Sequence, residues 1–279
     1  MLSPDRRLTP ANERVAAAEL RGVVESRQYT EGHWQACRSQ LASLCNCPDG
    51  RLVSQLLFGD RFRVLETRSG WAFGQVERDG YVGYVPDKVL GEDIRPTHLV
   101  RSLWTHVYPN ADMKSKPFAE LPFAARIAVD DDIACESFEA LGGGGFVPST
   151  HIQPIGRHAA DHAGQAARFI GAPYLWGGNS VLGIDCSGLV QVALMATGVD
   201  CPRDSDMQEA RLGRQVSGSE TLTRGDLVFW KGHVGIMEDS KWLIHATAHS
   251  MLVVREMLAD VRSRIEALGN TPFHGVRRL

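Results

Sequence analysis

The segment 174–195 constrains the fold of this chain more than any other part of its sequence. Glycines and small polar residues lead up to Cys186, and the apolar run 189–195 that follows has the pattern of a helix. Asp185 and Ser187 are residue types that cap helix N-termini. The sequence therefore predicts a thiol at a helix N-terminus, where the macrodipole and unpaired backbone N–H groups favour the thiolate. A cysteine taken alone is more often a small buried apolar residue.

Two histidines downstream are predicted to lie on one face of a β-hairpin. Two short apolar segments flank the polar turn 238–241, which is the pattern of a hairpin. If Met237 pairs with Lys241 around a short loop, His233 lies directly opposite His245 on the same face of the sheet. Directly opposed side chains have Cβ atoms about 4.5–5.5 Å apart, so one imidazole can hydrogen-bond to the other. A register slip of one residue would separate the two rings onto opposite faces.

A thiol together with two facing imidazoles is the residue set that cysteine-dependent nucleophilic catalysis requires. A neighbouring imidazole takes the proton of the thiol and later protonates the departing amine. A third polar group must hold that imidazole in its productive tautomer, and His245 could be that group. The pair of histidines therefore favours a catalytic role for Cys186 over a purely structural one.

Six segments of the sequence resemble the NlpC-type murein endopeptidases, which are papain-like cysteine peptidases. The segments follow the order and spacing of that family and lie within residues 155–279. The resemblance implies that Cys186 is the nucleophile, His233 the general base and His245 the orienting third residue. It also implies cleavage of the bond between γ-D-glutamate and a diamino acid, diaminopimelate or lysine, in cell-wall peptides. The segments are 173–178 (PYLWGG), 185–188 (DCSG), 202–208 (PRDSDMQ), 225–230 (GDLVFW), 232–236 (GHVGI) and 244–246 (IHA).

The same resemblance implies a preference for short peptides. Members of the family with N-terminal SH3-like domains act on free peptides with an unblocked L-alanine amine, as in murein recycling. By position, Asp185 would bind that ammonium, while Ser187 and Ser205 would contact the D-glutamate carboxylate or nearby backbone. Tyr174 would lie beside the thiolate, and Tyr81 is a candidate for the wall of the amine site. The simpler interpretations are an N-cap for Asp185 and barrel packing for Tyr81.

The rest of the chain is predicted to form an arm and two small barrels, which makes the fold class α+β. Residues 33–93 alternate short apolar strands with glycine-containing turns, as in a small antiparallel barrel, and resemble a bacterial SH3-like domain. Residues 94–153 resemble a second, more diverged copy. In the arm, Asn12 is predicted to cap a helix over 13–20. The predicted domains are the arm (1–32), the first barrel (33–93), the second barrel (94–153) and the papain-like catalytic domain (154–279).

Further elements are predicted inside the catalytic domain from its apolar periodicity. Asp204 is placed to cap the start of a helix, and residues 258–268 are amphipathic. Residues 252–255 and 273–279 are predicted as strands that extend the sheet of the hairpin.

Composition excludes several other classes of protein. The net charge of −3 over 279 residues provides no basic surface for nucleic acid or anionic membrane. The first ten residues lack the apolar core of a signal peptide, and no apolar run reaches membrane-spanning length, so we expect a cytoplasmic protein. In that reducing compartment the six cysteines are expected to stay unpaired. Neither a cofactor nor a metal is expected.

Three alternatives stay open at this point. The first is a papain-like amidase or acyltransferase that acts on another amide, because the same thiolate chemistry would serve it. The second is a non-catalytic wall-binding protein. The third is a zinc site made of Cys186, His233 and His245, which lacks a fourth ligand and a general-base glutamate in the sequence nearby.

Overall fold

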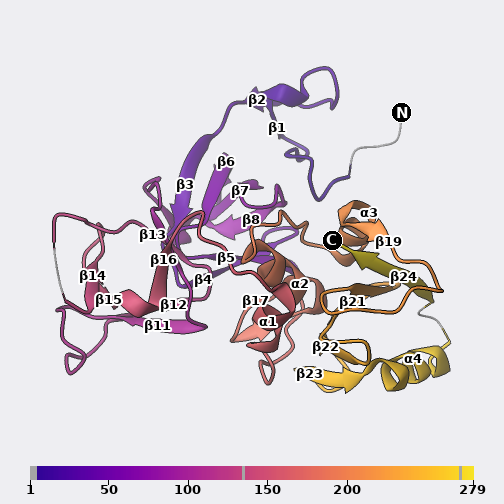
Figure 1. Ribbon diagram of the computed structural model, residues 1–279. Helices are drawn as coiled ribbons and strands as arrows, with labels where there is room; N and C mark the ends of the chain where they lie inside the picture. The colour runs from indigo at the N-terminus through magenta and orange to yellow at the C-terminus, as the bar shows by residue number, and fades with distance from the viewer. Residues whose placement is uncertain (1–4, 134–135, 270–271) are drawn as a thin grey trace. The chain divides into compact units, whose positions relative to one another are not determined.

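The computed structural model describes residues 5–133, 136–269 and 272–279 and divides into two compact units, Met1–Ile155 and Gly156–Leu279 (Figure 1). The predicted boundary after residue 153 lies within two residues of this division. The finer division of the first unit into an arm and two barrels stays a prediction.

The first unit contains a seven-stranded antiparallel sheet, called here the first strand group. Its spatial order is β5-β4-β8-β7-β6-β3-β9. Alternate residues of these strands point inward and form one apolar core, which includes Leu44, Phe62 and Val85. The strands are β3 (His33–Cys37), β4 (Leu41–Cys45), β5 (Leu52–Leu57), β6 (Arg61–Arg68), β7 (Trp71–Val76), β8 (Val82–Pro86) and β9 (Leu90–Gly91).

The helix predicted in the N-terminal arm is wrong. Its residues form strand β1 (Val15–Ala17) and a 3₁₀ turn at Ala18–Leu20, and β1 pairs in parallel with β2 (Gln28–Thr30). The Asn12 side chain does cap backbone, but it accepts the N–H groups of Arg14 and Val15 in a local turn that competes with a helix. All three residues of β1 are buried, so tertiary packing overrides the helix propensity of this alanine-rich segment.

A second strand group follows in the same unit and has an apolar core of its own, which includes Val100, Ile127 and Val147. It consists of a three-stranded sheet and two strand pairs, all antiparallel. The three-stranded sheet has the order β13 (Arg126–Ile127), β10 (His98–Val100), β16 (Ile152–Pro154), and the pairs are β11 (Trp104–Val107) with β12 (Ala119–Pro122) and β14 (Phe138–Ala140) with β15 (Phe146–Pro148).

The two strand groups meet at Phe58 and Gly59. The Phe58 carbonyl accepts the N–H of Arg126 at 2.8 Å, and the Phe58 ring packs against the core of the second group. Gly59 has φ +78°, and a Cβ at this position would lie 1.9 Å from the Arg126 carbonyl oxygen. The junction therefore requires glycine both for its backbone conformation and for the closeness of the second chain segment.

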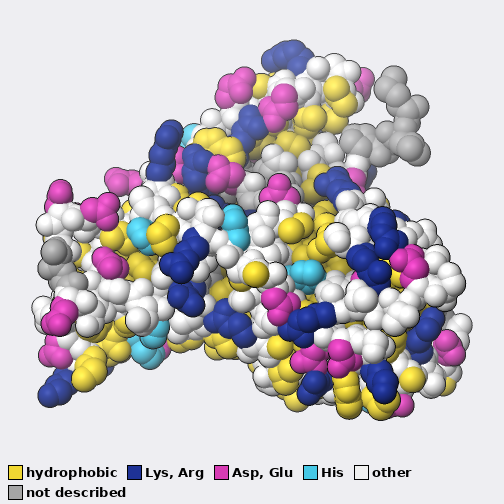
Figure 2. Space-filling view, viewed as in Figure 1, with side chains coloured by type: hydrophobic (Ala, Val, Ile, Leu, Met, Phe, Trp, Pro, Cys, Tyr) yellow, Lys and Arg dark blue, Asp and Glu magenta, His cyan; other side chains and the backbone are white. Residues whose placement is uncertain are grey.

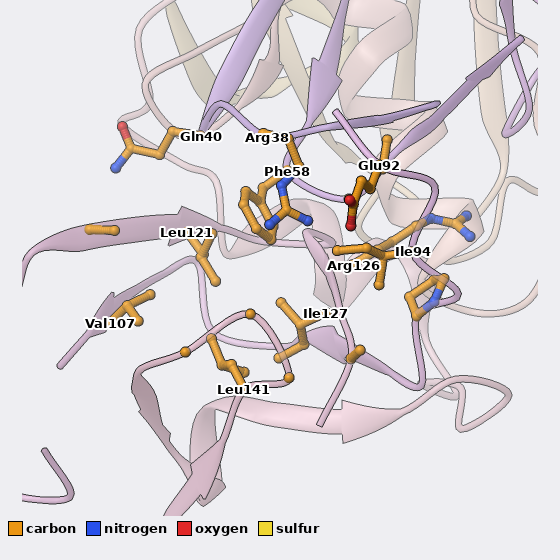
Figure 3. Close-up of a pocket in the computed structure, with 18 of the residues that line it drawn as sticks. Arg38, Gln40, Phe58, Glu92, Ile94, Val107, Leu121, Arg126, Ile127 and Leu141 are labelled. Carbon is orange, nitrogen blue, oxygen red and sulfur yellow. The ribbon is translucent and has the colours of Figure 1, made fainter. Parts of the chain in front are cut away.

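A cavity of about 750 Å³ lies beside this junction (Figure 3). Arg38 and Phe58 line it from the first strand group, and Leu121, Ile127 and Leu141 line it from the second. The Arg38 guanidinium carbon lies 5.5 Å from the centre of the Phe58 ring, within cation–π range. The wall of the cavity is thus shared between the two groups, and its shape depends on the junction.

Replacement of Gly59 by alanine should lower the free energy of unfolding more than the same change at Gly70. Both glycines have φ near +80°, but a Cβ at Gly70 meets no atom within 4 Å. Gly70→Ala therefore carries only the backbone cost, about 1–2 kcal/mol. Gly59→Ala adds a clash with backbone, which should cost roughly 1–3 kcal/mol more. Urea denaturation of the full chain measures both, and equal losses would contradict the proposed close approach.

The second unit is built on a six-stranded antiparallel sheet with helix α2 packed against strands β21 and β22 (Figure 1). The sheet order is β19-β24-β20-β21-β22-β23. Its strands are β19 (Arg214–Gln215), β20 (Leu227–Trp230), β21 (His233–Met237), β22 (Trp242–Thr247), β23 (Leu252–Met257) and β24 (Phe273–Arg278). The helices are α1 (His162–Ala167), α2 (Cys186–Met195), α3 (Ser205–Arg211) and α4 (Leu258–Ala267), and a small pair, β17 (Asn179–Ser180) and β18 (Gly183–Ile184), precedes α2.

Several predicted elements of this unit are confirmed. Helix α3 begins after Asp204, helix α4 covers most of the amphipathic segment, and β23 and β24 extend the sheet. The predicted α+β class is also confirmed. Among the helices that the structure describes, none combines the length and the apolar character needed to cross a bilayer. On the face seen in Figure 2, basic and acidic side chains are interspersed, as the small net charge leads one to expect.

The predicted register of the β21–β22 hairpin is wrong by two residues. Met237 pairs with Leu243 rather than with Lys241. The Asp239 carboxylate accepts the backbone N–H groups of Lys241 and Trp242, at 2.7 and 2.9 Å. This side-chain-to-backbone turn places the loop one residue later than predicted.

Candidate active site

Cys186 is the first residue of helix α2, as predicted. Asp185 is the N-cap, and its carboxylate accepts the backbone N–H of Gly188 at 2.7 Å. The backbone N–H groups of Ser187 and Val234 face the sulfur. Since Val234 follows His233 directly, the start of strand β21 lies against the thiol. The fold therefore brings the predicted nucleophile and the predicted base to the same place.

Burial outweighs the helix terminus in setting the ionisation of this thiol. Removal from water raises the pKa of Cys186 to about 12, and the negative charge of Asp185 adds to the increase. The N–H groups of Val234 and Ser187, and the Arg203 guanidinium, act in the opposite direction. The expected thiolate-favouring effect of the helix terminus is present, but it does not dominate. The neutral thiol is the resting form, so the predicted role as nucleophile requires that its proton be removed.

The two histidines form a hydrogen-bonded pair. The Nε2 atom of His233 lies 2.8 Å from Nδ1 of His245, with the ring planes at 65°. The observed register, extended by one residue, places Gly235 opposite His245, so His233 is a diagonal neighbour and not the directly opposed residue that was expected. A shift of two residues keeps both side chains on the same face, and for this reason the predicted contact survives.

A carboxylate and a guanidinium continue the pair away from the thiol. The Nε2 atom of His245 lies 2.9 Å from Oε2 of Glu256, and Arg264 contacts both carboxylate oxygens of Glu256 at 2.7 and 2.8 Å. Neither Glu256 nor Arg264 is among the residues predicted from the sequence. The strand alternation that places Glu256 and His245 on one face becomes visible only when the β22–β23 register is known, with Leu243 opposite Glu256.

Both imidazoles are neutral in this environment. Burial lowers the pKa of His233 to about 3, and the positive charge of Arg264 contributes in the same direction. Burial also lowers the pKa of His245, although the hydrogen bond to Glu256 and its charge raise it in part. A neutral His233 has a lone pair free to accept the thiol proton, which is what a general base requires.

The Asp185 carboxylate is paired inside the unit with Arg203, whose side chain is only 1% exposed. The two guanidinium contacts measure 2.9 and 2.8 Å. The N–H groups of Gly177 and Gly188 and the hydroxyl of Ser187 also donate to this carboxylate. Five donors already exceed the roughly four lone-pair directions of a carboxylate, so an ammonium would have to share an engaged oxygen. The N-cap role is confirmed, and the ammonium role stays a prediction.

The remaining predicted residues lie in different surroundings. Tyr174 is half-buried, and burial together with the charges of Cys186 and Asp185 raises its pKa, so its hydroxyl lies near the thiol. Ser205 is half-buried at the start of α3. Tyr81 is 4% exposed and belongs to the apolar core of the first strand group. Tyr81 therefore has a packing role in that strand group, and a contact of Tyr81 with substrate stays a prediction.

The arrangement of the histidines does not suit a metal. Their facing nitrogens are at hydrogen-bond distance from each other, and the outer nitrogen of His245 is bound to Glu256. Within residues 5–133, 136–269 and 272–279, no group of three or more histidine, cysteine or acidic side chains is arranged to hold a metal ion.

A buried thiol at a helix N-terminus, with a hydrogen-bonded pair of histidines on the strands packed against that helix, is the arrangement of a papain-like cysteine peptidase. Residues 171–264 match the model of the NlpC/P60 family, and residues 44–90 match that of the bacterial dipeptidyl-peptidase SH3 domain. The C-terminal unit therefore carries a domain of the NlpC/P60 family, and a bacterial SH3 domain precedes it. The resemblance noted in the sequence is confirmed.

Individual relatives extend this similarity over most of the chain. Dipeptidyl-peptidase 6 of Lysinibacillus sphaericus is 27% identical over 234 residues, which make up 75% of this chain and 86% of that protein. The γ-D-glutamyl-L-lysine dipeptidyl-peptidase of Bacillus subtilis (strain 168) is 27% identical over 223 residues, 72% of this chain and 74% of that protein. The crystal structure of a NlpC/P60 family protein from Bacillus cereus ATCC 10987 has a TM-score of 0.74 at 22% identity and covers 88% of this chain and 99% of its own. It shows the same fold.

Loss of Arg203 should destabilise the second unit strongly. Arg203→Leu leaves the Asp185 carboxylate buried without its cation, and breaking a buried ion pair in this way costs about 3–5 kcal/mol. Arg214→Leu is a matched control, because Arg214 makes an exposed ion pair with Glu220 that contributes little to stability. Urea denaturation followed by tryptophan fluorescence, to which the buried Trp230 of this unit contributes, measures both variants. Similar losses would mean that the buried pair is not needed for folding.

The acid limb of the pH–rate profile should lie at unusually low pH. Because the pKa of His233 is lowered, this base stays unprotonated as the pH falls through the ordinary imidazole range. The kcat/KM profile reports groups of the free enzyme, so we expect its acid limb below about pH 5.5, a unit under the usual histidine value. An acid limb at or above pH 6.5 would contradict the burial of the base.

Proposed function

We propose that this protein hydrolyses the γ-D-glutamyl–diamino acid bond of free cell-wall peptides that begin with L-alanine. The observation that carries the proposal is the hydrogen-bonded pair of His233 and His245 beside the thiol of Cys186, within an NlpC/P60 domain. Two relatives, from B. subtilis and B. cereus, are named γ-D-glutamyl-L-lysine dipeptidyl-peptidases, which supports this choice of bond. A place in murein recycling, in the cytoplasm, is part of the proposal.

The chemistry follows from the resting state of the site. The Nδ1 atom of His233, whose Nε2 is engaged by His245, accepts the thiol proton as the sulfur of Cys186 attacks the γ-glutamyl carbonyl. A tetrahedral intermediate collapses to a thioester when the imidazolium gives that proton to the amine of the departing diamino acid. Water, deprotonated by the same imidazole, then hydrolyses the thioester and restores the thiol. The raised pKa of Tyr174 keeps its hydroxyl protonated beside the sulfur, so it can donate a hydrogen bond there.

Selection for a free L-alanine amine is assigned to Asp185, with Tyr81 as a candidate wall and Ser187 and Ser205 at the D-glutamate carboxylate. A carboxylate that receives an ammonium makes a charge-assisted hydrogen bond. Because Asp185 is already paired with Arg203, a substrate without the ammonium does not leave this carboxylate without a cation. The discrimination should therefore be smaller than the roughly 3–5 kcal/mol of an unpaired buried charge.

Incubation with L-Ala-γ-D-Glu-L-Lys and with the corresponding diaminopimelate peptide tests the proposal, with the products identified by mass spectrometry. The expected products are L-Ala-γ-D-Glu and the free diamino acid. Cys186→Ala is the control: it should remain folded, by circular dichroism, and release no product. Absence of cleavage of both peptides by the intact enzyme, or equal cleavage by Cys186→Ala, would contradict the proposed function.

Acetylation of the L-alanine amine tests whether the enzyme requires a free amine on its substrate. The acetylated peptide cannot present an ammonium to Asp185, and we expect kcat/KM to fall about tenfold or more, equivalent to about 1.4 kcal/mol. Equal rates on the free and blocked peptides would remove Asp185 from this role and leave the assignment of Cys186 intact.

A further inference from the structure

We propose that Glu256, held by Arg264, is a positioning residue that sets the tautomers of both active-site histidines. The kinetic part of this inference rests on the proposed function, whereas its structural part does not depend on the identity of the substrate. Glu256 lies on strand β23 and Arg264 on helix α4, which follows that strand directly. Neither residue reaches the thiol, so any influence on catalysis has to pass through His245.

Both ring nitrogens of His245, whose side chain is 1% exposed, have a partner. Nε2 lies 2.9 Å from the Glu256 carboxylate, and Nδ1 lies 2.8 Å from Nε2 of His233. An ionised carboxylate only accepts hydrogen bonds, so Nε2 of His245 must carry the hydrogen. Burial keeps this imidazole neutral, and its Nδ1 is then an acceptor.

The tautomer of His245 determines the tautomer of His233. Since Nδ1 of His245 accepts, Nε2 of His233 must be the donor across the 2.8 Å contact. A neutral His233 protonated at Nε2 has its lone pair at Nδ1, the nitrogen left to exchange a proton with Cys186. The opposite tautomer of His245 would donate a hydrogen bond from Nδ1, so Nε2 of His233 would be the acceptor and the hydrogen of His233 would lie on Nδ1. In that form Nδ1 of His233 has no lone pair to accept the thiol proton. The Glu256 carboxylate therefore selects the productive tautomer of His233 through its hydrogen bond to His245.

Arg264 keeps Glu256 in the form that this role requires. Its two terminal nitrogens lie 2.7 and 2.8 Å from the two carboxylate oxygens, a bidentate arrangement. The hydrogen bonds from Arg264 lower the pKa of Glu256 to about 2, so the carboxylate is ionised, and an acceptor only, throughout the neutral range. The β22–β23 register places Glu256 opposite Leu243, on the same face as His245, and thereby aims it at the ring.

The test combines tautomer measurement with kinetics on the full chain. Long-range ¹H–¹⁵N correlation on ¹⁵N-histidine-labelled protein should show both His233 and His245 protonated at Nε2. In Glu256→Ala we expect the Nδ1–H form of His245 to become populated. We also expect kcat to fall roughly 10- to 100-fold with KM within about twofold, because an imidazole in the wrong tautomer loses its function as a base.

The double variant Glu256→Gln/Arg264→Met distinguishes a positioning role of Glu256 from a purely structural role of its ion pair with Arg264. Removal of the arginine leaves the glutamine oxygen free to accept the hydrogen of His245 Nε2. We therefore expect this variant to keep the wild-type tautomers and a kcat at least severalfold above that of Glu256→Ala, although it has no ion pair. It also keeps the test decisive if the alanine variant does not fold.

Glu238→Ala is the matched control, because Glu238 makes an ion pair with Arg255 that does not contact the histidines. It should leave the tautomers and kcat unchanged. Wild-type tautomers in Glu256→Ala, or equal kcat loss in Glu256→Ala and the double variant, would overturn the proposal. Because the tautomers are measured without substrate, failure of the murein peptides to be cleaved would contradict the proposed function and not this inference.

Discussion

The packing of helix α2 against strands β21 and β22 is the contact on which the active site depends. Nine of the ten residues of α2 are buried, so the helix has little freedom to rotate or slide relative to the sheet. The N–H of Val234, on β21, faces the sulfur of Cys186 at the first position of the helix. Because His233 precedes Val234, the packing that buries the apolar residues also fixes the position of His233 relative to Cys186.

Burial of the site determines the charge states of Cys186 and His233. It moves both members of the thiol–imidazole pair toward their neutral forms, which removes the cost of holding two charges out of water before substrate arrives. The ion pair of Asp185 and Arg203 lies beneath the same helix terminus, where the carboxylate raises the pKa of the thiol and the guanidinium lowers it. The protein thus stabilises the helix terminus with a charge pair in which the carboxylate has the larger effect on the thiol.

Features of the site that depend on short-range sequence pattern could be predicted. The capped helix start at Cys186 follows from residue types next to one another, and the shared face of His233 and His245 follows from the two-residue period of a strand. That shared face survived a register error of two residues, since only an odd shift would have separated the rings.

Features that depend on contacts between distant segments could not be predicted. The partner of Asp185 is Arg203, 18 positions away in the sequence, and Glu256 reaches His245 only through a strand pairing that residue types do not specify. In the arm, the helix propensity of residues 13–20 is overridden because β1 is buried by tertiary packing. At Asp239, one side-chain turn sets the loop position, and the sequence pattern alone is compatible with several positions.

The central claim is that His233 activates the thiol of Cys186, and the most direct test is the rate at which iodoacetamide alkylates this cysteine, followed by peptide mass mapping. The exposed Cys47 serves as an internal control in the same sample. We predict that His233→Ala slows the alkylation of Cys186 about tenfold or more while the rate at Cys47 is unchanged, because only the former thiol has an imidazole to take its proton. Equal alkylation of Cys186 in the wild type and in the variant would contradict the account.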